Sequence, residues 1–379
     1  MTALEGQLLL DGALVPGRIE LDAGWIAAVE VDPAVSIDRI VAPGFIDLQV
    51  NGGYGVDFGE EPERIGQVAA WLPETGVTAF LPTIVSSFAE RYHRVFQAMP
   101  EAVAGSGARV LGLHLEGPFL APGQKGAHAL DAIEAADDAL FDELLAEPSV
   151  RLVTVAPERP GALERIARLV EQGVLVSLGH TDASFEQFEA GIDAGARMAT
   201  HLFNAMSQLD RHTPGAVGAA LVDERVTGGL IADGVHSHPT ILALTARAKG
   251  VERVALVSDM MAAAGKGPGC YSLNDIPVTV DGTSARLENG RLAGSILTMD
   301  AAVRNMVSWG GVSIADALMM ASAVPARSLG LDDMGAIAVG NRADLVMLGS
   351  DLSLRETWVG GEPRRPQANR EKTDTAARH

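Results

Sequence analysis

The feature that most constrains the fold is a set of apolar segments, each of which ends abruptly in an acidic residue or a histidine. An apolar run at residues 110–115 stops at Glu116, and similar runs lead into His180, His201 and Asp259. A segment that is apolar at nearly every position is buried on both faces, as in a parallel sheet. Because the carboxyl ends of parallel strands meet at one edge, we expect these four side chains at one rim.

The pattern between the chain ends predicts an α/β architecture. Apolar strands alternate with amphipathic helices over about residues 42–332. Together with polar side chains at so many strand ends, this alternation predicts a (β/α)8 barrel of the TIM type. An open, doubly wound sheet is the competing architecture. Over about residues 262–295 the pattern changes to short strands and turns, and we expect a β insertion or lid near the rim.

The two ends of the chain show short alternating strands, at residues 1–41 and 333–361. Neither set alone is large enough to bury a core. We therefore expect both ends to form one small β-sandwich, with the barrel inserted between its halves. Residues 362–379 carry almost no large apolar side chain, and we expect them to form a disordered tail.

Charge and composition exclude several classes of partner. The chain has 379 residues and a formal net charge of −20. A negative charge of this size repels nucleic acid and anionic membranes. A phosphorylated substrate would need cations placed locally. The one cysteine, Cys270, cannot form an intrachain disulfide, and the first residues lack the pattern of a signal peptide, so we expect a cytoplasmic protein. No apolar run approaches the roughly 20 residues that span a bilayer.

The residue types at the rim point to hydrolytic chemistry with a metal ion. Glu116, His180 and His201 form a donor set that a Zn²⁺-like ion takes in catalytic sites, with one position left for water. A carboxylate beside that water, for which Asp259 is the candidate, can accept its proton and later donate it to a leaving amine. Each residue alone also has a structural explanation: a core histidine, a strand-end cap or a helix N-cap. Their joint occurrence at one rim favours function.

Several short motifs in the barrel carry a resemblance when taken together. They are Ala-Pro-Gly-Phe-Ile-Asp at 42–47, His-Leu-Glu-Gly-Pro-Phe at 114–119, Lys-Gly-Ala-His at 125–128, Gly-His-Thr at 179–181, Thr-His-Leu-Phe-Asn-Ala-Met at 200–206, Ala-Asp-Gly-Val-His at 232–236 and Ser-Asp at 258–259. In combination they resemble the N-acetylglucosamine-6-phosphate deacetylase family of the amidohydrolase superfamily. The resemblance covers nearly the whole barrel and the split β domain.

The resemblance implies a catalytic role for individual residues. Glu116, His180 and His201 would bind one divalent ion, with Zn²⁺ expected and Fe²⁺, Co²⁺ or Mn²⁺ as alternatives. Asp259 would be the general acid and base. His128 would contact the substrate and polarise its acetyl carbonyl.

The resemblance also implies a phosphate site, with one departure from the family pattern. The backbone at Asn204 and Ala205, together with His236, would hold the sugar phosphate. In the family, an arginine of the partner subunit in a homodimer also reaches the phosphate. His212 occupies the position of that arginine here, with Arg211 one residue earlier. Since imidazole is only partly charged near neutral pH and lacks a bidentate fork, the departure weakens the expected phosphate contact.

Two further points bear on the site. Gln49 and Asn51 stand where many amidohydrolases carry a His-x-His pair for a second metal, and neutral amides are poor Zn²⁺ ligands. We therefore predict a one-metal site. His128 and His236 also have a simpler explanation as turn-forming loop residues.

The function that the resemblance implies is metal-dependent hydrolysis of N-acetyl-D-glucosamine 6-phosphate to D-glucosamine 6-phosphate and acetate, in amino-sugar catabolism and cell-wall sugar recycling. An amidohydrolase acting on another N-acetylated amino sugar, phosphorylated or not, would share every metal and acid-base residue. A non-catalytic sugar-phosphate binding protein is a more distant alternative, because binding alone needs no general base beside a metal. A structural barrel with incidental rim histidines is the last alternative.

Overall fold

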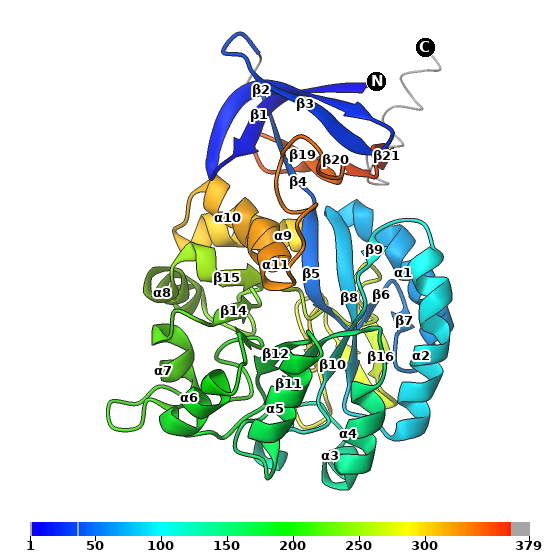
Figure 1. Ribbon diagram of the computed structural model, residues 1–379, viewed down its shortest axis with the longest axis vertical. Coiled ribbons are helices and arrows are strands. Elements are labelled where there is room, and N and C mark those ends of the chain that lie inside the picture. Colours follow the sequence, from blue (N-terminus) through cyan, green and yellow to red (C-terminus); the bar gives the residue numbers. More distant parts are fainter. Residues whose placement is uncertain (1, 36–37, 365–379) are drawn as a thin grey trace.

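The computed structural model describes residues 2–35 and 38–364. Figure 1 shows a barrel of parallel strands enclosed by helices, with a separate β sheet packed on one end. Both parts of the expected architecture are therefore confirmed, the (β/α)8 barrel and the small β domain formed from the two chain ends.

The barrel strands pair in chain order and run parallel. They are β5 (Phe45–Val50), β8 (Val77–Val85), β10 (Leu113–Glu116), β11 (Val150–Val155), β12 (Leu175–Leu178), β13 (Met198–Ala199), β14 (Thr227–Leu230) and β15 (Val254–Leu256), with β9 (Arg109–Val110) paired to β8. Their side chains are almost all buried, as continuous apolar runs predict. A parallel bridge between Val50 and Met260 brings the first and last strands together and nearly closes the barrel.

Helices follow each barrel strand and form the outer layer (Figure 1). They are α1 (Ile65–Trp71), α2 (Ala89–Ala104), α3 (Leu130–Ala135), α4 (Asp138–Leu145), α5 (Ala162–Glu171), α6 (Phe185–Asp193), α7 (Gly215–Val222), α8 (Pro239–Lys249), α9 (Met299–Asn305), α10 (Ile314–Ala321) and α11 (Ala323–Ser328). Shorter helical turns are η1 (Pro62–Arg64), η2 (Leu72–Thr75), η3 (Pro122–Gln124), η4 (Val251–Arg253) and η5 (Met306–Gly310). Within the described residues, no helix combines the length and apolar character that a membrane crossing requires.

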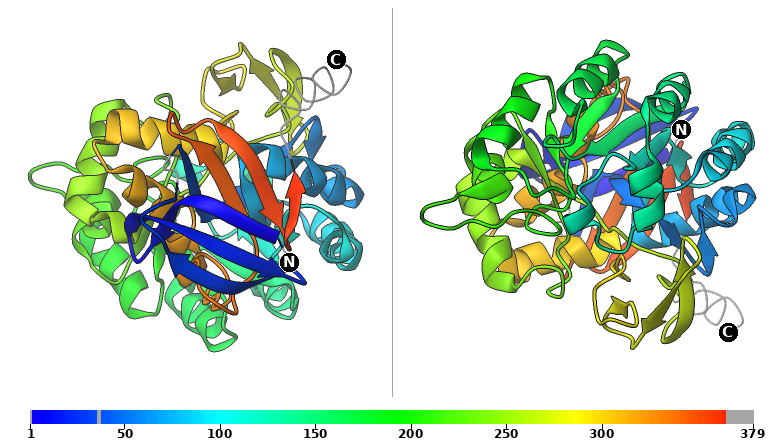
Figure 2. Two further views of the ribbon diagram at one scale, coloured as in Figure 1. Left: turned by 90° about the horizontal axis from the view of Figure 1, so that it is seen from above. Right: turned by 90° about the horizontal axis from the view of Figure 1, so that it is seen from below.

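The two chain ends form one sheet, ordered β21-β20-β19-β4-β1-β2-β3. Its strands are β1 (Thr2–Leu10), β2 (Ala13–Asp22), β3 (Trp25–Val31), β4 (Arg39–Pro43), β19 (Leu345–Gly349), β20 (Leu354–Val359) and β21 (Glu362–Arg364). The blue and orange-red strands lie together in Figure 1 and in the left view of Figure 2. Leu8 and Ile19 pack there with Leu345 and Trp358, so each end completes the hydrophobic core of the other.

The far end of the chain differs in part from the expected tail at residues 362–379. Glu362–Arg364 pairs antiparallel with β20 and extends the sheet. Residues 365–379 lie outside the described residues. The limits proposed above for the separate domains stay a prediction.

The direction of β5 decides where the functional rim lies. Because β4 belongs to the terminal sheet and leads directly into β5, the barrel strands start near that sheet and end at the opposite face (Figure 1). The residues that follow the strands therefore gather at the face away from the terminal sheet.

A three-stranded antiparallel sheet occupies the stretch expected as an insertion. It consists of β16 (Gly269–Leu273), β17 (Ile276–Val280) and β18 (Ala285–Arg286), and it projects beside the ring of helices in both views of Figure 2. Asn274 anchors it to the barrel, since its side-chain amide donates to Ser86 O at 3.2 Å and its backbone N–H donates to Asp57 Oδ2 at 3.2 Å. A small strand pair, β6 (Gly52–Gly53) and β7 (Val56–Asp57), precedes α1.

Candidate functional site

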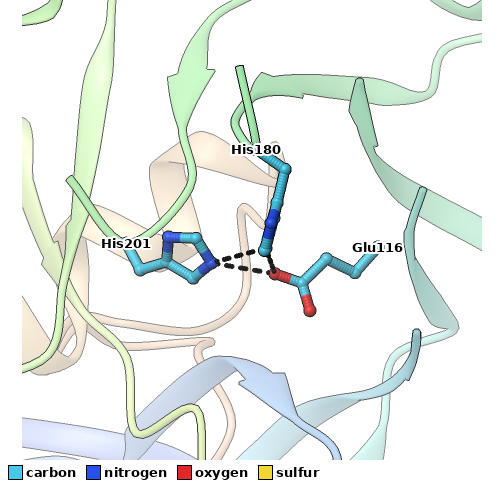
Figure 3. Close-up of side chains that lie close together, drawn as sticks. All are labelled: Glu116, His180 and His201. Carbon is cyan, nitrogen blue, oxygen red and sulfur yellow. Dashed lines mark hydrogen bonds and ion pairs between the residues drawn. The ribbon is translucent and has the colours of Figure 1, made fainter. Parts of the chain in front are cut away.

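Two histidine side chains meet the carboxylate of Glu116 at the ends of the barrel strands (Figure 3). Glu116 ends β10, while His180 and His201 follow β12 and β13. Glu116 Oε1 lies 3.1 Å from His180 Nε2 and 3.0 Å from His201 Nε2, and the two nitrogens are 3.1 Å apart. All three side chains are buried. The expected convergence of these residues at one rim is therefore present in the structure.

The backbone at these strand ends adopts a left-handed conformation that residues other than glycine rarely take. The φ angles are 48° at His180, 28° at His201 and 51° at Asp259. Backbone hydrogen bonds hold the chain there: Asp259 N–H donates to Gln49 O at 2.9 Å, and His180 O accepts from Ala121 N at 2.9 Å. Strain of this kind concentrates at functional sites, where the surrounding structure fixes the direction of a side chain.

Hydrogen bonding fixes the tautomer of His180. Its Nδ1 lies 2.7 Å from Gln124 O, which can only accept, so the Nδ1 proton points at that carbonyl and the lone pair of Nε2 faces Glu116. This is the arrangement that metal-ligating histidines show. Two imidazole nitrogens and one carboxylate oxygen, mutually within 4.8 Å, fit a single divalent ion.

The charge of Glu116 is set by its partners. Burial favours the neutral acid, but the three imidazoles of His128, His180 and His201 around the carboxylate outweigh burial and hold the pKa of Glu116 well below its usual range. The carboxylate therefore stays anionic, which is the form that binds a cation.

Asp259 lies beside the cluster and is connected to it through Gln49. Gln49 Nε2 donates to Glu116 Oε1 at 3.0 Å and to Asp259 Oδ1 at 3.1 Å, and Asn51 Nδ2 donates to the same Oδ1 at 2.8 Å. Oδ2 has no hydrogen bond to any described residue, so it is the oxygen free to exchange a proton. Burial and the negative charge of Glu116 raise the pKa of Asp259 to about 6.

His128 presents a neutral N–H to the same space. The Ser86 backbone N–H donates to His128 Nδ1 at 3.1 Å, so the proton of the neutral ring is on Nε2, which lies 3.6 Å from Glu116 Oε2. Burial lowers the pKa of His128 to about 4. His128 is thus a hydrogen-bond donor at neutral pH without carrying a full charge.

A cavity of about 360 Å³ opens over these residues, with walls from the barrel loops and from the β16–β18 insertion. The expected site residues that line it are Glu116, His128, His180, His201, Asn204, Ala205, His236 and Asp259. The structure does not bring Arg211 and His212 into this cavity. Both are exposed on the loop between β13 and α7.

His236 reaches the cavity from a loop that begins after β14. Its Nδ1 lies 2.7 Å from Asp233 Oδ2, and Asp233 Oδ1 accepts from the backbone N–H of Val235 and of His236. The Asp233 carboxylate therefore fixes the orientation of the imidazole ring.

Sequence reasoning missed several residues that line the cavity. Gln124, Leu273, Arg291 and Leu292 all line it, and the last three come from the insertion. The available signal was the change of pattern at residues 262–295, which placed an insertion near the rim without indicating which of its residues face inward.

Comparison with known proteins places this geometry in context. The model of the amidohydrolase family matches residues 40–367. The chain is 39% identical over 361 residues to the N-acetylgalactosamine-6-phosphate deacetylase of Escherichia coli O157:H7, covering 93% of this chain and 96% of that protein. It is 41% identical over 340 residues to the human N-acetylglucosamine-6-phosphate deacetylase, covering 86% and 83% respectively.

Solved structures show the same similarity. A mutant N-acetyl-D-glucosamine-6-phosphate deacetylase from Mycobacterium smegmatis, in complex with N-acetyl-D-glucosamine 6-phosphate, has a TM-score of 0.90 and 35% identity, covering 96% of this chain and 98% of that one. The N-acetylglucosamine-6-phosphate deacetylase from Thermotoga maritima has a TM-score of 0.90 and 33% identity, covering 96% and 100%.

The geometry predicts how metal content responds to two histidine substitutions. The purified protein should contain about one divalent ion per chain, and His201→Ala should lose most of it because a ligand is removed. His236→Ala is the matched control, since this histidine lines the cavity but lies outside the Glu116 cluster. Elemental analysis of the three proteins measures the effect. Full metal content in His201→Ala would exclude His201 as a ligand.

Proposed function

The chain belongs to the amidohydrolase family, and we propose that it hydrolyses N-acetyl-D-glucosamine 6-phosphate to D-glucosamine 6-phosphate and acetate. This reaction serves amino-sugar catabolism and the recycling of cell-wall sugars. The observation that carries the proposal is the bridge through Gln49, whose one amide nitrogen contacts both Glu116 and Asp259. It keeps a carboxylate of raised pKa next to the donor cluster, an arrangement that binding alone does not require.

One divalent ion is assigned to Glu116, His180 and His201, with Zn²⁺ as the expected species. The buried oxygen and nitrogen donors and the lone pair of His180 Nε2 support this assignment. When bound, such an ion supplies a Lewis acid that lowers the pKa of water and polarises a carbonyl oxygen.

The side chains around the cluster move the protons. Asp259 Oδ2 accepts a proton from the attacking water while the oxygen of that water forms a bond to the acetyl carbon. His128 Nε2–H donates a hydrogen bond to the carbonyl oxygen as negative charge develops there. When the carbon–nitrogen bond breaks, Asp259 returns its proton to the departing amine. Gln49 and Asn51 keep Oδ1 occupied, so Oδ2 is the oxygen that takes part.

N-acetyl-D-galactosamine 6-phosphate is a second candidate substrate. The similarity to a deacetylase named for that sugar covers nearly the full length of both proteins. The two sugars differ only in the configuration at C4, so the reacting acetamido group and the phosphate are common to both. The metal and acid-base residues serve either substrate without change.

A homodimer is part of the proposal. Arg211 and His212 are exposed and lie outside the cavity of their own chain, on a loop that protrudes at the left of Figure 1. This position suits a loop that contacts a partner subunit, as the family resemblance implies.

Acetate release from three sugars tests the proposed substrate. The phosphorylated sugars, N-acetylglucosamine 6-phosphate and its C4 epimer, should be hydrolysed with higher kcat/KM than unphosphorylated N-acetylglucosamine, because the phosphate adds binding energy. The ratio between the two epimers decides between the two candidate sugars. Equal or reversed preference for the neutral sugar would contradict a phosphorylated substrate, and no release from any of them would contradict the deacetylase assignment.

Replacement of the proposed base tests the mechanism. Asp259→Asn should lower kcat by about 10²- to 10⁴-fold, since the amide cannot accept the proton. Metal content and the thermal unfolding midpoint should stay close to those of the parent protein. Asp131→Asn, at an exposed position on α3, is the matched control and should keep full activity. Near-normal turnover in Asp259→Asn would remove Asp259 from the mechanism.

A further inference from the structure

One cation from the insertion lines the cavity. Among the described residues that line it, Arg291 is the only lysine or arginine. Its backbone is bonded, since its N–H donates to Asn289 Oδ1 at 3.1 Å and its carbonyl accepts from Leu287 N at 2.9 Å. Its guanidinium has no hydrogen-bond or ion-pair partner within the part of the chain that the structure describes. A cation of this kind is free to pair with a ligand.

The other charges around the cavity make this cation important for an anionic ligand. Glu116 and Asp259 contribute carboxylates to the cavity, and the chain as a whole carries a formal charge of −20. His236 contacts the Asp233 carboxylate through Nδ1 at 2.7 Å, so this pair of side chains adds no net positive charge. Asn204 and Ala205 offer only neutral groups. A phosphate group therefore meets one permanent positive charge among the side chains that line the cavity, and a guanidinium suits phosphate oxygens through its paired N–H donors.

The backbone of Arg291 is held in place by the residues around it. The two residues that follow Arg291 pair with β18 of the insertion. Leu292 lies opposite Arg286, and the Ala293 N–H donates to Ala285 O at 3.0 Å. Ala293 also packs in a small hydrophobic core with Ala127, the neighbour of His128. The insertion thus holds the backbone of Arg291 on the same structure that packs against the loop of a proposed catalytic residue.

We infer that Arg291 binds the phosphate of the sugar substrate from within the same chain. The inference rests on the proposed function and deepens it, since it names the residue that selects a phosphorylated over a neutral amino sugar. It places a phosphate contact on the insertion of the same chain, whereas Arg211 and His212 lie outside the cavity of their own chain and could reach a phosphate only from a partner subunit.

Binding and turnover together test this assignment. Calorimetry on the metal-containing protein measures the affinity for glucosamine 6-phosphate, and acetate release gives kcat and KM for phosphorylated and neutral N-acetylglucosamine. Arg291→Ala should weaken the binding of glucosamine 6-phosphate and raise KM for the phosphorylated substrate by about 10- to 100-fold, the usual loss for a charge-assisted hydrogen bond. Its kcat/KM for the neutral sugar should stay within about twofold of the parent value, because that sugar lacks the phosphate partner.

Three further proteins serve as comparisons. Arg291→Lys should restore part of the affinity, since it keeps the charge without the fork. Lys266→Ala removes a cation of the same insertion that lies over the Tyr54 ring and does not line the cavity, and it should bind like the parent. Arg211→Ala tests whether the loop between β13 and α7 binds the phosphate instead.

The outcomes separate the two proposals. Unchanged affinity for glucosamine 6-phosphate in Arg291→Ala would overturn the inference, as would a parent protein that does not bind this sugar phosphate. A loss confined to Arg211→Ala would also overturn it. The proposed function fails on a different result, the absence of acetate release by the parent protein.

Discussion

The buried carboxylate of Glu116 is the interaction on which the functional face depends. Burying an ionised carboxylate without partners carries a large free-energy cost, so the fold must place compensating groups around it. His128, His180 and His201 and the amide of Gln49 supply them. These residues come from separate strands and loops, and the order of the barrel strands brings them to one point.

The same surroundings divide two neighbouring carboxylates into different roles. The surrounding imidazoles outweigh burial at Glu116 and keep its pKa low, which suits a ligand. Asp259 receives amide hydrogen bonds at one oxygen only, and burial with the nearby charge of Glu116 raises its pKa. Paired acids whose environments push their pKa values apart can serve separately as anion and as proton carrier. Gln49 touches both, so neither carboxylate can shift without disturbing the other.

The sequence contains enough information to predict the cluster but not the whole cavity. Glu116, His180 and His201 could be predicted because each directly ends an apolar run, and a parallel strand places its last residue at the rim. His236 lies several residues beyond β14, so the strand pattern does not place it; the family resemblance indicated it, and in the structure the Asp233 side chain holds its ring at the cavity. Arg291 could not be predicted, because its position depends on how the insertion packs against Ala127 and the barrel. Such long-range packing leaves no local pattern in the sequence. The terminal sheet was predictable for the opposite reason, since neither chain end alone has enough strands for a core.

An anomalous difference map from zinc-loaded crystals tests the central claim most directly. Data collected on both sides of the zinc absorption edge locate the ion without reference to activity. The account predicts one peak per chain, at about 2.0–2.3 Å from Glu116 Oε1, His180 Nε2 and His201 Nε2. A peak elsewhere in the cavity, or a second peak beside Gln49 and Asn51, would contradict a single-metal site organised around Glu116.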